Sequence, residues 1–464
     1  MPTPPRRPTI RAAAATVGLV AATAAAHGQT VCGAWEPLVA DLLGGIGSVE
    51  TRAQDLIVFD AGDGPMLYLA GNFEVVVDPV FGEVRAPGLA RWDGQRWSAV
   101  PGLDGPGLEL DGRATTLEVF DDGSGPALYV GGVFTTAGGQ DATSIARWDG
   151  VAWSGMDGPG VPGGLTWIFD IHVHDFGDGP MLYAGGLATR ASEPGLATVW
   201  RYDGAAWAEL GDERPAGGEV YALASSDGSL FAGGPFGLLG DEPAPGIARF
   251  DGATWTTPLG PGQTVFSSRF WPLLTTGPGG REALIAAGTF LVTEGDETIA
   301  TQLAAWDGER WNSLADTPIS INWTPTCMAA FDDGSGPALF VAGAGIAPGS
   351  NIARVQDRRL AAVSPLAVDV VYELFVYDDG TGPVLLAGGE SRRGGATATF
   401  LGRWRPGAFC PADLDGDCVL DVMDFLTFQN RFDRGDPRAD FDGDGSLTIF
   451  DFLAFQNAFD AGCP

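Results

Sequence analysis

The chain has 464 residues, with 59 acidic residues against 26 basic ones, a formal net charge of -33 and no lysine. This charge argues against a polyanion such as nucleic acid as a partner, and a hydrophobic content of 45% argues against a disordered acidic chain. The 70 glycines and 33 prolines follow no Gly-x-y period, so they indicate the many turns of an all-β protein rather than collagen.

The N-terminal segment has the pattern of a secretory signal. Arg6, Arg7 and Arg11 precede an apolar stretch over 12–26, and the small residues Ala24 and Ala26 offer a cleavage site. We therefore expect a signal peptide over 1–29 and a secreted or cell-surface bacterial protein. No later apolar run is long enough for a membrane span, so we expect none in the mature chain. An uncleaved signal is the alternative, and it would leave a membrane anchor.

A repeated unit fills the middle of the chain, over 32–409. Each unit carries an Arg-aromatic-Asp step or a degenerate copy of it, and the spacing between steps is about 52 residues. The seven steps begin at Arg91, Arg147, Arg201, Arg249, Ala305, Arg354 and Arg403. Two hairpins are visible in each unit, one before the step and one across it, which predicts four strands.

Seven units of four strands predict a seven-bladed β-propeller, because each sheet then packs face to face on its neighbours and only the closed ring is stable. The segment Ala34-Trp35-Glu36-Pro37-Leu38 resembles the fourth strand of a unit but precedes the first one. We expect it to complete the last blade, whose own fourth strand is degenerate. The repeat is similar to kelch and related bacterial propeller repeats, although it lacks the strict kelch signature.

The repeated aromatic and acidic residues are interpreted as structural. A tryptophan found at the same place in most units is typical of packing between sheets, and paired aspartates beside glycine are typical of hairpin turns. The joins between the second and third strands of a unit, and between one unit and the next, vary and share one face of the ring, which makes that face the candidate ligand surface. Four unrepeated aromatics lie in or near these joins: Phe81, Trp167, Trp271 and Trp323.

No enzyme signature is recognisable in the repeats. His172 and His174 are the histidines left after signal cleavage, and they lie on one face of an expected strand as a packed or solvated pair, or as metal ligands if a carboxylate joins them. A pair of carboxylates for glycoside hydrolysis is not visible in a sequence, because the separation of the two groups is set by the fold.

The segment 410–464 contains two copies of a twelve-residue acidic loop, and each copy continues into Phe-Leu-x-Phe-Gln-Asn-x-Phe-Asp. Oxygen atoms at loop positions 1, 3, 5, 7, 9 and 12 are the ligands that surround Ca²⁺ in loops of this kind. The expected ligands of the first site are Asp413, Asp415, Asp417, Val419 through its carbonyl, Asp421 and Asp424. Those of the second site are Asp440, Asp442, Asp444, Ser446 through its carbonyl, Thr448 and Asp451. The phenylalanine spacing predicts an amphipathic helix after each loop.

This duplicated half EF-hand resembles a type I dockerin. The resemblance implies a small all-α domain with two Ca²⁺ sites that docks onto a cohesin-like or other surface anchoring protein. Loop position 6 holds Gly445 in the second copy but Cys418 in the first, where a side chain strains the turn, so the first site is expected to be the weaker one. The partner-contact positions of dockerins correspond here to Val422, Met423, Ile449 and Phe450, which is unusual for a cohesin contact.

Five cysteines leave the disulfide pattern open. Cys410 and Cys463 bracket the last segment and form one possible pair, as in dockerin-like tails that end in Gly-Cys. Cys32 is the alternative partner of Cys410 if the N-terminal strand closes the ring, and Cys418 competes for either. The odd count, which includes Cys327, leaves at least one thiol unpaired or paired with another molecule.

The sequence therefore predicts an exported, noncatalytic propeller that binds or displays a glycan or protein ligand and is attached to an extracellular assembly by a calcium-dependent tail. The alternative is a polysaccharide-degrading enzyme delivered by that tail. A third possibility is a tail that acts as a sorting signal with no cohesin partner.

Overall fold

The structure is a computed structural model that describes residues 33–461 with internal gaps. The gaps are 45–50, 104–111, 157, 159–164, 191–192, 212–214, 277–282, 316–323, 334–335, 348–349, 364–367, 379–381, 394–395, 407–411, 413, 415–419, 421, 437–438 and 443–444. The expected signal peptide and the residues Cys32, Cys410, Cys418 and Cys463 lie outside the described residues. Cys327 is described, and it is a buried free thiol.

Antiparallel sheets of four strands follow one another along the chain, and all use the same strand order. The first contains β3 (Arg52–Asp60), β4 (Pro65–Asn72), β7 (Leu89–Trp92) and β8 (Trp97–Ala99). The second contains β9 (Arg113–Asp121), β10 (Pro126–Val133), β13 (Ile145–Trp148) and β14 (Trp153–Gly155). The third contains β15 (Leu165–His174), β16 (Met181–Arg190), β17 (Glu193–Tyr202) and β18 (Trp207–Glu209).

The next two sheets repeat this arrangement. One contains β20 (Ala222–Ser226), β21 (Ser229–Gly233), β24 (Ile247–Phe250) and β25 (Trp255–Thr256). The other contains β26 (Gln263–Thr276), β27 (Ala283–Glu294), β28 (Glu297–Trp306) and β29 (Trp311–Ser313). Short strands in the joins form small sheets of their own: β2 (Asp41–Leu43) with β5 (Val75–Asp78) and β6 (Gly82–Arg85), β11 (Thr136–Ala137) with β12 (Gln140–Asp141), and β19 (Pro215–Ala216) with β22 (Leu238–Leu239) and β23 (Glu242–Pro243).

The remaining strands form one larger sheet that consists of two such units joined by a single pairing of Ala344 with Val370. Its first unit contains β30 (Thr324–Asp332), β31 (Pro337–Ala347), β32 (Ser350–Gln356) and β33 (Arg359–Ala362). Its second unit contains β34 (Val370–Asp378), β35 (Pro383–Arg393), β36 (Ala396–Pro406) and the N-terminal β1 (Gly33–Val39).

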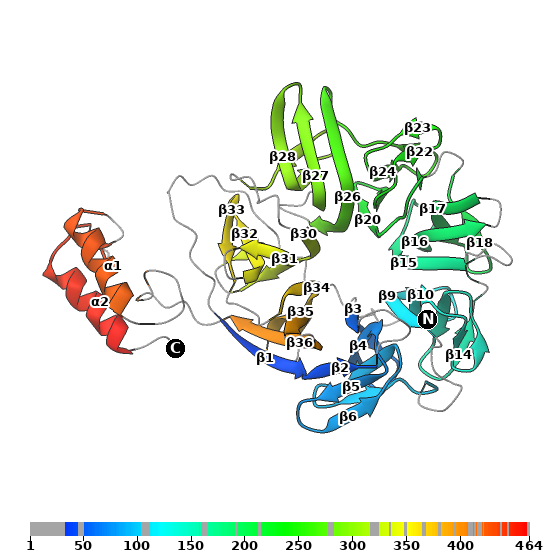
Figure 1. The fold of residues 1–464 in the computed structure, drawn as a ribbon, viewed down its shortest axis with the longest axis horizontal. Helices are drawn as coiled ribbons and strands as arrows, with labels where there is room; N and C mark the ends of the chain where they lie inside the picture. Colours follow the sequence, from blue (N-terminus) through cyan, green and yellow to red (C-terminus); the bar gives the residue numbers. More distant parts are fainter. Residues whose placement is uncertain are drawn as a thin grey trace, which may run out of the picture.

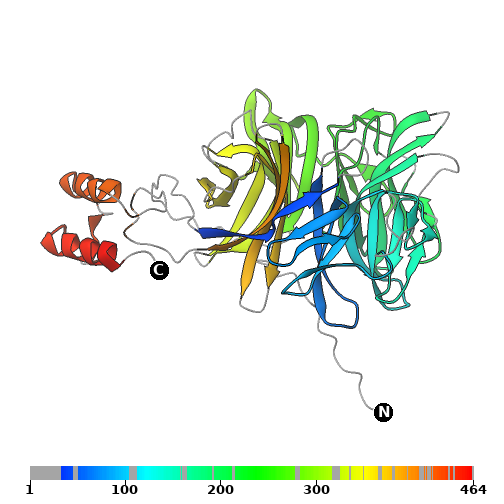
Figure 2. The same ribbon diagram turned by 60° about the horizontal axis from the view of Figure 1, so that its bottom comes forward.

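The first strand of each unit lies on the inside, and these inner strands contact one another in chain order around an axis, from β3 through β9, β15, β20, β26 and β30 to β34. The strand β34 in turn contacts β3. The result is the β-propeller-like ring visible in Figure 1, and the turned view in Figure 2 shows its sheets edge-on. The all-β expectation for the middle of the chain is confirmed at this level.

The N-terminal strand closes the ring as the sequence predicted. It pairs antiparallel with β36, so that Trp35 lies opposite Trp404 with their ring centroids 6.4 Å apart. Glu36 also accepts a hydrogen bond from the Arg403 guanidinium at 2.6 Å. The last unit therefore takes its fourth strand from the other end of the chain.

The repeated tryptophans are packing residues. The pair Trp148 and Trp153 has ring centroids 5.3 Å apart, and both side chains are buried. The indole Nε1 of Trp153 donates to the Pro101 carbonyl, and Trp311 donates in the same way to Pro258. Because each acceptor lies just beyond the fourth strand of the preceding sheet, these indoles bond one sheet to the next.

The paired aspartates have the turn role that the sequence predicted. Asp121 Oδ1 accepts hydrogen bonds from the backbone N–H groups of Gly123 and Gly125, each at 3.0 Å. Both glycines have positive φ, +100° and +112°, which residues with a side chain rarely adopt. Asp60 and Asp175 cap equivalent turns.

The C-terminal segment forms two helices, α1 (Val422–Asp433) and α2 (Ile449–Ala461). Phe428 and Phe455 are buried between them with stacked rings, 4.5 Å between centroids and 8° between planes. The phenylalanine spacing thus correctly predicted two helices that pack through these side chains. None of the described helices is both long and apolar enough to cross a membrane.

Candidate functional site

Part of the second acidic loop has the geometry of a cation site. Asp440, Asp442 and Asp451 each place a carboxylate oxygen within 4.8 Å of the others. Gly445 has φ +81° and donates its N–H to Asp440 Oδ2 at 2.8 Å, so the glycine at loop position 6 makes the sharp turn that the sequence required. Three carboxylates this close repel one another unless a cation lies between them, and oxygen ligands suit Ca²⁺.

Asp451 anchors this loop to the start of α2. It is fully buried, and its Oδ1 accepts from the N–H groups of Phe441 at 2.7 Å and Asp442 at 3.2 Å, while its Oδ2 accepts from Thr448 at 2.7 Å. The hydrogen bond from Thr448 is the main cause that lowers the pKa of Asp451, so the carboxylate is ionised. The Thr448 hydroxyl accepts from the Phe450 N–H and caps the helix.

Of the expected ligands in the first loop, Asp424 is the one that the structure describes. Asp424 is fully buried and accepts a hydrogen bond from the Leu414 N–H at 2.6 Å, the same interaction that Asp451 makes with Phe441. The other expected side-chain ligands in the two loops lie outside the described residues: Asp413, Asp415, Asp417, Asp421 and Asp444. The same is true of Val419, whereas Ser446 is described.

A second acidic cluster surrounds the ring axis, and the sequence analysis did not find it. Its members, which we call the axial carboxyls, come from the inner strands β3, β9, β15 and β34: Asp55, Glu118, Asp170 and Glu373. Protein encloses all four, yet each keeps some solvent-accessible surface. Burial raises the pKa of Asp55 and of Glu118 to about 7, and raises the pKa values of Asp170 and Glu373 well above the ordinary range. The groups also raise one another's pKa through charge repulsion, so they lie near one another.

Two of the axial carboxyls bond one inner strand to the next. Asp55 Oδ2 accepts from the Leu117 N–H of β9 at 2.6 Å, and Asp170 Oδ2 accepts from the Leu223 N–H of β20 at 2.6 Å. Between them, the Thr116 hydroxyl accepts from the Ile171 N–H at 3.2 Å. The three residues are equivalent in their strands, since each follows an irregularity in the pairing with the second strand.

Glu118 has no such counterpart. The aligned inner strands carry Ile57 and His172 at its position, and its Oε1 accepts a hydrogen bond from the neighbouring Val119 N–H at 3.0 Å. Burial is the largest cause of its raised pKa, and the nearby charge of Asp55 adds to it. Glu118 is therefore a partly accessible carboxyl group that still holds its proton close to neutral pH.

Cations and aromatic rings lie where the inner strands begin. The Arg52 guanidinium lies 4.6 Å from the centre of the Tyr372 ring, and that of Arg113 lies 5.7 Å from the centre of the Trp167 ring. Burial, followed by the charge of Arg52, lowers the pKa of Arg113, so the two guanidinium groups are close together. Trp167 is the member of the predicted aromatic set that the structure brings to this end of the ring.

The other three predicted aromatics do not join it. Phe81 is 64% exposed in the turn between β5 and β6. Trp271 belongs to β26, but its side chain is not among those described, and Trp323 lies outside the described residues.

The two histidines form a packed pair around a serine. His172 Nε2 lies 2.7 Å and His174 Nδ1 lies 2.8 Å from the Ser225 hydroxyl of β20. Burial lowers the pKa of His172 to about 4, so its imidazole is neutral. In the described part of the chain, the group of three potential metal ligands is the aspartate cluster of the second loop, and neither histidine belongs to it.

Comparison with known proteins adds one finding. No protein-family model and no curated protein matches the chain. Among solved structures, the chain is similar to the Trypanosoma rangeli sialidase in complex with the inhibitor DANA, with 11% identity and a TM-score of 0.35. The match covers 80% of this chain and spans 59% of the sialidase chain.

The interpretation of the ring as a noncatalytic binding or display module is corrected here. The matched structure is named as a sialidase, and no described feature of the ring confirms a module that only binds or displays. The likeness is too small to transfer a substrate or a mechanism, so the functional argument rests on this chain's own residues.

Proposed function

We propose that this chain is an exported polysaccharide-degrading enzyme. In this proposal the ring is a seven-bladed β-propeller, the axial carboxyls supply acid-base chemistry, and a dockerin-like tail with two Ca²⁺ sites attaches the enzyme to a surface or extracellular anchoring protein. The observation that carries the proposal is Glu118, an unrepeated and partly accessible carboxyl group whose pKa is about 7.

Glycoside hydrolysis uses one protonated carboxyl group to donate to the leaving oxygen and one carboxylate to stabilise or attack the sugar cation. Asp55 suits the ionised role, because the N–H groups of Leu117 and Leu56 donate to its two oxygens at 2.6 and 2.7 Å. Glu118 suits the protonated role, because the negative charge of Asp55 holds its proton more tightly. The pKa of each group is raised to about 7, so near neutral pH the pair can hold one proton and one negative charge.

The residues at the start of the inner strands are suited to holding a sugar chain. Trp167 and Tyr372 offer ring faces, and Arg52 and Arg113 offer guanidinium donors beside them. Sugar rings present C–H faces that pack on aromatic rings and hydroxyl groups that accept hydrogen bonds from guanidinium groups. We assign these four residues to substrate positioning.

The tail is assigned to anchoring. Val422 and Met423 at the start of α1 are 65% and 50% exposed, and Ile449 and Phe450 at the start of α2 are 63% and 62% exposed. Large apolar side chains exposed at equivalent places of two helices favour a protein partner. A cohesin-like or other surface anchoring protein with an apolar contact face fits them.

The decisive experiment is an assay of the full chain, in calcium-containing buffer, against a panel of polysaccharides, with reducing ends as the readout. On any substrate that is cleaved, Glu118→Gln is expected to lower kcat/KM by roughly 10²- to 10⁴-fold, because the amide has no proton to donate. Wild-type kcat/KM should fall as the pH rises above about 7, where Glu118 loses its proton.

The matched control is Glu83→Gln, because Glu83 is an exposed residue of β6. It should leave both kcat/KM and the pH profile unchanged. Unchanged cleavage by Glu118→Gln would contradict the assignment of the acid, and a lack of cleavage across the panel would contradict the proposed activity.

A further inference from the structure

In the second sheet, the arginine of the repeated Arg-aromatic-Asp step forms an ion pair with an aspartate of the same sheet. The Arg147 Nε lies 3.5 Å from Asp122 Oδ2, and the Tyr129 hydroxyl donates to the same carboxylate at 3.1 Å. Tyr129 and Arg147 are directly paired across β10 and β13. The sheet that begins at β30 has the same ion pair, with the Arg354 Nε 2.9 Å from Asp333 Oδ2. In both sheets the carboxylate that neutralises the arginine comes from the inner hairpin turn.

The third sheet keeps the arginine and the tyrosine but has lost the carboxylate. Tyr183 and Arg201 are paired across β16 and β17 in the same register, yet the turn residue that corresponds to Asp122 is Phe176. Within the described part of the chain, Arg201 makes no ion pair and the Tyr183 hydroxyl makes no hydrogen bond. The Arg201 side chain is exposed, whereas that of Arg147 is 14% exposed.

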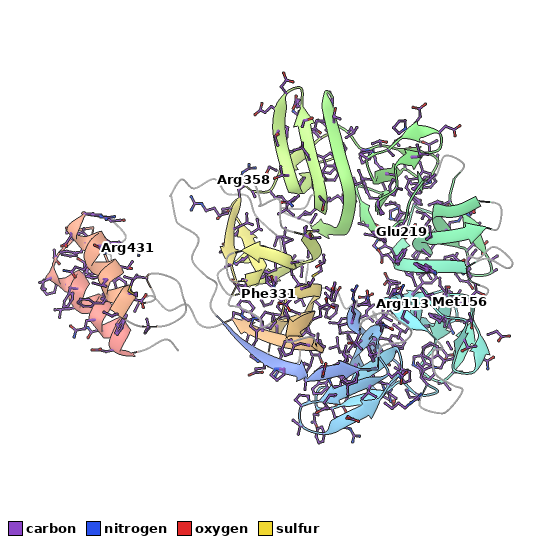
Figure 3. The ribbon with its side chains drawn as sticks, in the orientation of Figure 1. Arg113, Met156, Glu219, Phe331, Arg358 and Arg431 are labelled. Carbon is purple, nitrogen blue, oxygen red and sulfur yellow. The ribbon has the colours of Figure 1, made fainter. Side chains whose placement is uncertain are left out.

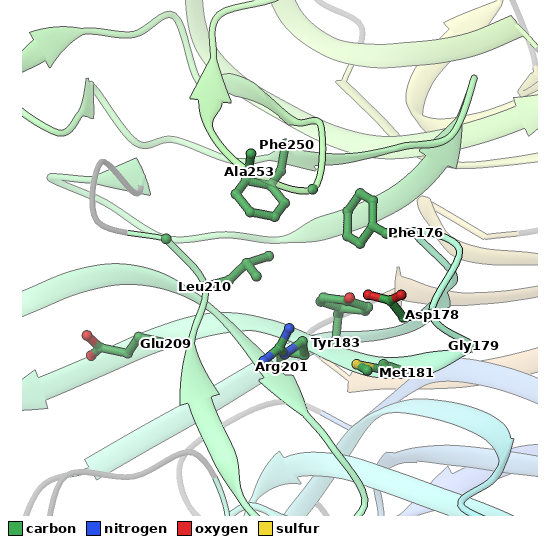
Figure 4. A pocket seen from close by; sticks show the side chains of 12 residues that line it. Phe176, Asp178, Gly179, Met181, Tyr183, Arg201, Glu209, Leu210, Phe250 and Ala253 are labelled. Carbon is green, nitrogen blue, oxygen red and sulfur yellow. The ribbon is translucent and has the colours of Figure 1, made fainter.

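A pocket of about 290 Å³ opens at this place, between the third and fourth sheets, on the face of the ring that carries the Asp-Gly turns. Figure 4 shows Arg201 and Tyr183 on one side of it and the rings of Phe176 and Phe250 on the other. The two phenyl rings meet edge to face, 5.6 Å between centroids. Leu210 also lines the pocket, which therefore combines an apolar aromatic wall with one guanidinium group.

We propose that this pocket binds a small monocarboxylate with a flat apolar portion. The ligand's carboxylate would take the place that the Asp122 carboxylate holds in the second sheet, accepting from Arg201 and from the Tyr183 hydroxyl. A guanidinium group presents a planar pair of donors that matches a carboxylate. Asp178 and Glu209 also line the pocket, and their charges disfavour a dianion such as phosphate.

The flat portion of the ligand would lie against Phe176 and Phe250. An aromatic ring and the C–H face of an acidic sugar both satisfy this requirement, so an aromatic acid and an acidic sugar are the two candidate ligands. The site is separate from the axial carboxyls, because none of them lines it. A test of this pocket is therefore independent of the test of the proposed glycan cleavage.

The test is isothermal titration of the full chain with benzoate and with glucuronate, using benzamide and glucose as neutral counterparts. Saturable binding of either acid, without binding of its neutral counterpart, supports the proposal and identifies the source. Arg201→Gln should weaken that binding at least about tenfold, as expected for loss of a charged hydrogen-bonding partner. Arg354→Gln, which removes a paired arginine elsewhere, should leave it unchanged.

Two variants at position 176 distinguish the effect of adding a negative charge from the effect of removing the phenyl ring. Phe176→Asp introduces the carboxylate found in the second sheet and in the sheet that begins at β30, so it should abolish binding and raise the Tm. Phe176→Asn has nearly the shape of the aspartate without its charge, so it should weaken binding only by the loss of the Phe176 ring and retain more affinity than Phe176→Asp. Absence of saturable binding of both acids by the wild type, or equal binding by folded Arg201→Gln, would overturn the proposal.

Discussion

The ring and the C-terminal segment are built on opposite principles. In the ring, neighbouring sheets share apolar clusters, and buried indoles such as those of Trp148 and Trp311 fill them. The C-terminal segment has one small cluster around Phe428 and Phe455, while 12 aspartates and 3 arginines lie between Cys410 and Pro464. The ring can therefore be stable through burial alone, whereas we expect the tail to need an external cation to hold its acidic loops together. Figure 3 shows how densely side chains fill the spaces between the sheets.

Removal of calcium is expected to cause the largest difference in stability between the ring and the C-terminal segment. We expect EGTA to unfold α1 and α2 in the full chain while the ring stays folded, because the buried carboxylates Asp424 and Asp451 lose their cations. The measurement is scanning calorimetry with circular dichroism, in which the chelator should abolish one transition and the helical signal but leave the other transition in place. Loss of both transitions together would show that the regions are not independent, and loss of neither would contradict the calcium sites.

A cavity in the ring should have a smaller effect, and on the ring alone. Trp311→Ala is expected to lower the free energy of unfolding by roughly 3 to 5 kcal/mol, because it empties a buried site and leaves the Pro258 carbonyl without its donor. Trp207, which is only partly buried, is the matched control, and Trp207→Ala should cost less. Urea unfolding followed by tryptophan fluorescence measures both variants, and an equal cost would contradict the packing role assigned to the repeated tryptophans.

The smallest expected effect concerns pH. The pKa of Asp55 rises from 3.8 to about 7 on folding, so the folded state keeps a proton that the unfolded state releases. Its contribution to stability is complete below pH 4 and is lost as the pH rises towards 7. Asp55→Asn should flatten the decline of Tm with pH over this window.

The control for this measurement is Asp251, an exposed turn residue. The hydrogen bond from the Thr254 N–H lowers the pKa of Asp251, so its stabilising effect is lost only as the pH falls below about 4. Asp251→Asn should therefore leave the slope between pH 4 and 7 unchanged. A slope that is identical in wild type and Asp55→Asn would show that Asp55 does not titrate in this window.

Local signals in the sequence were sufficient for the strand hairpins, the turn aspartates, the packed tryptophans and the two helices. Ring closure was also predictable, because Trp35 carries the pattern of a fourth strand. The axial carboxyls were missed because strands far apart in the chain bring them together. One signal was present: Asp55, Thr116, Asp170 and Glu373 all stand five positions before the turn aspartate of their unit, where a polar residue is unusual for an inner strand.

The pocket at Arg201 was missed for a different reason. The sequence pattern favoured the variable joins as the recognition surface, because the Asp-Gly turns are similar from unit to unit. Comparison of Phe176 with Asp122 shows that a single substitution in a uniform turn leaves an arginine without its ion-pair partner. Departures from a repeat are therefore as informative as residues outside it.

The pairing of β1 with β36 also sets an order of events during synthesis. Glu36 of β1 bonds to Arg403 of β36, a residue 367 positions later. Nearly the entire ring is therefore synthesised before β1 has its partner strand. Until then the edge of β1 presents unpaired N–H and C=O groups to any other strand. Pairing of β1 with β36 is thus the folding step most open to competition from a second molecule. Exchange of β1 between two chains is the misassembly that this architecture favours.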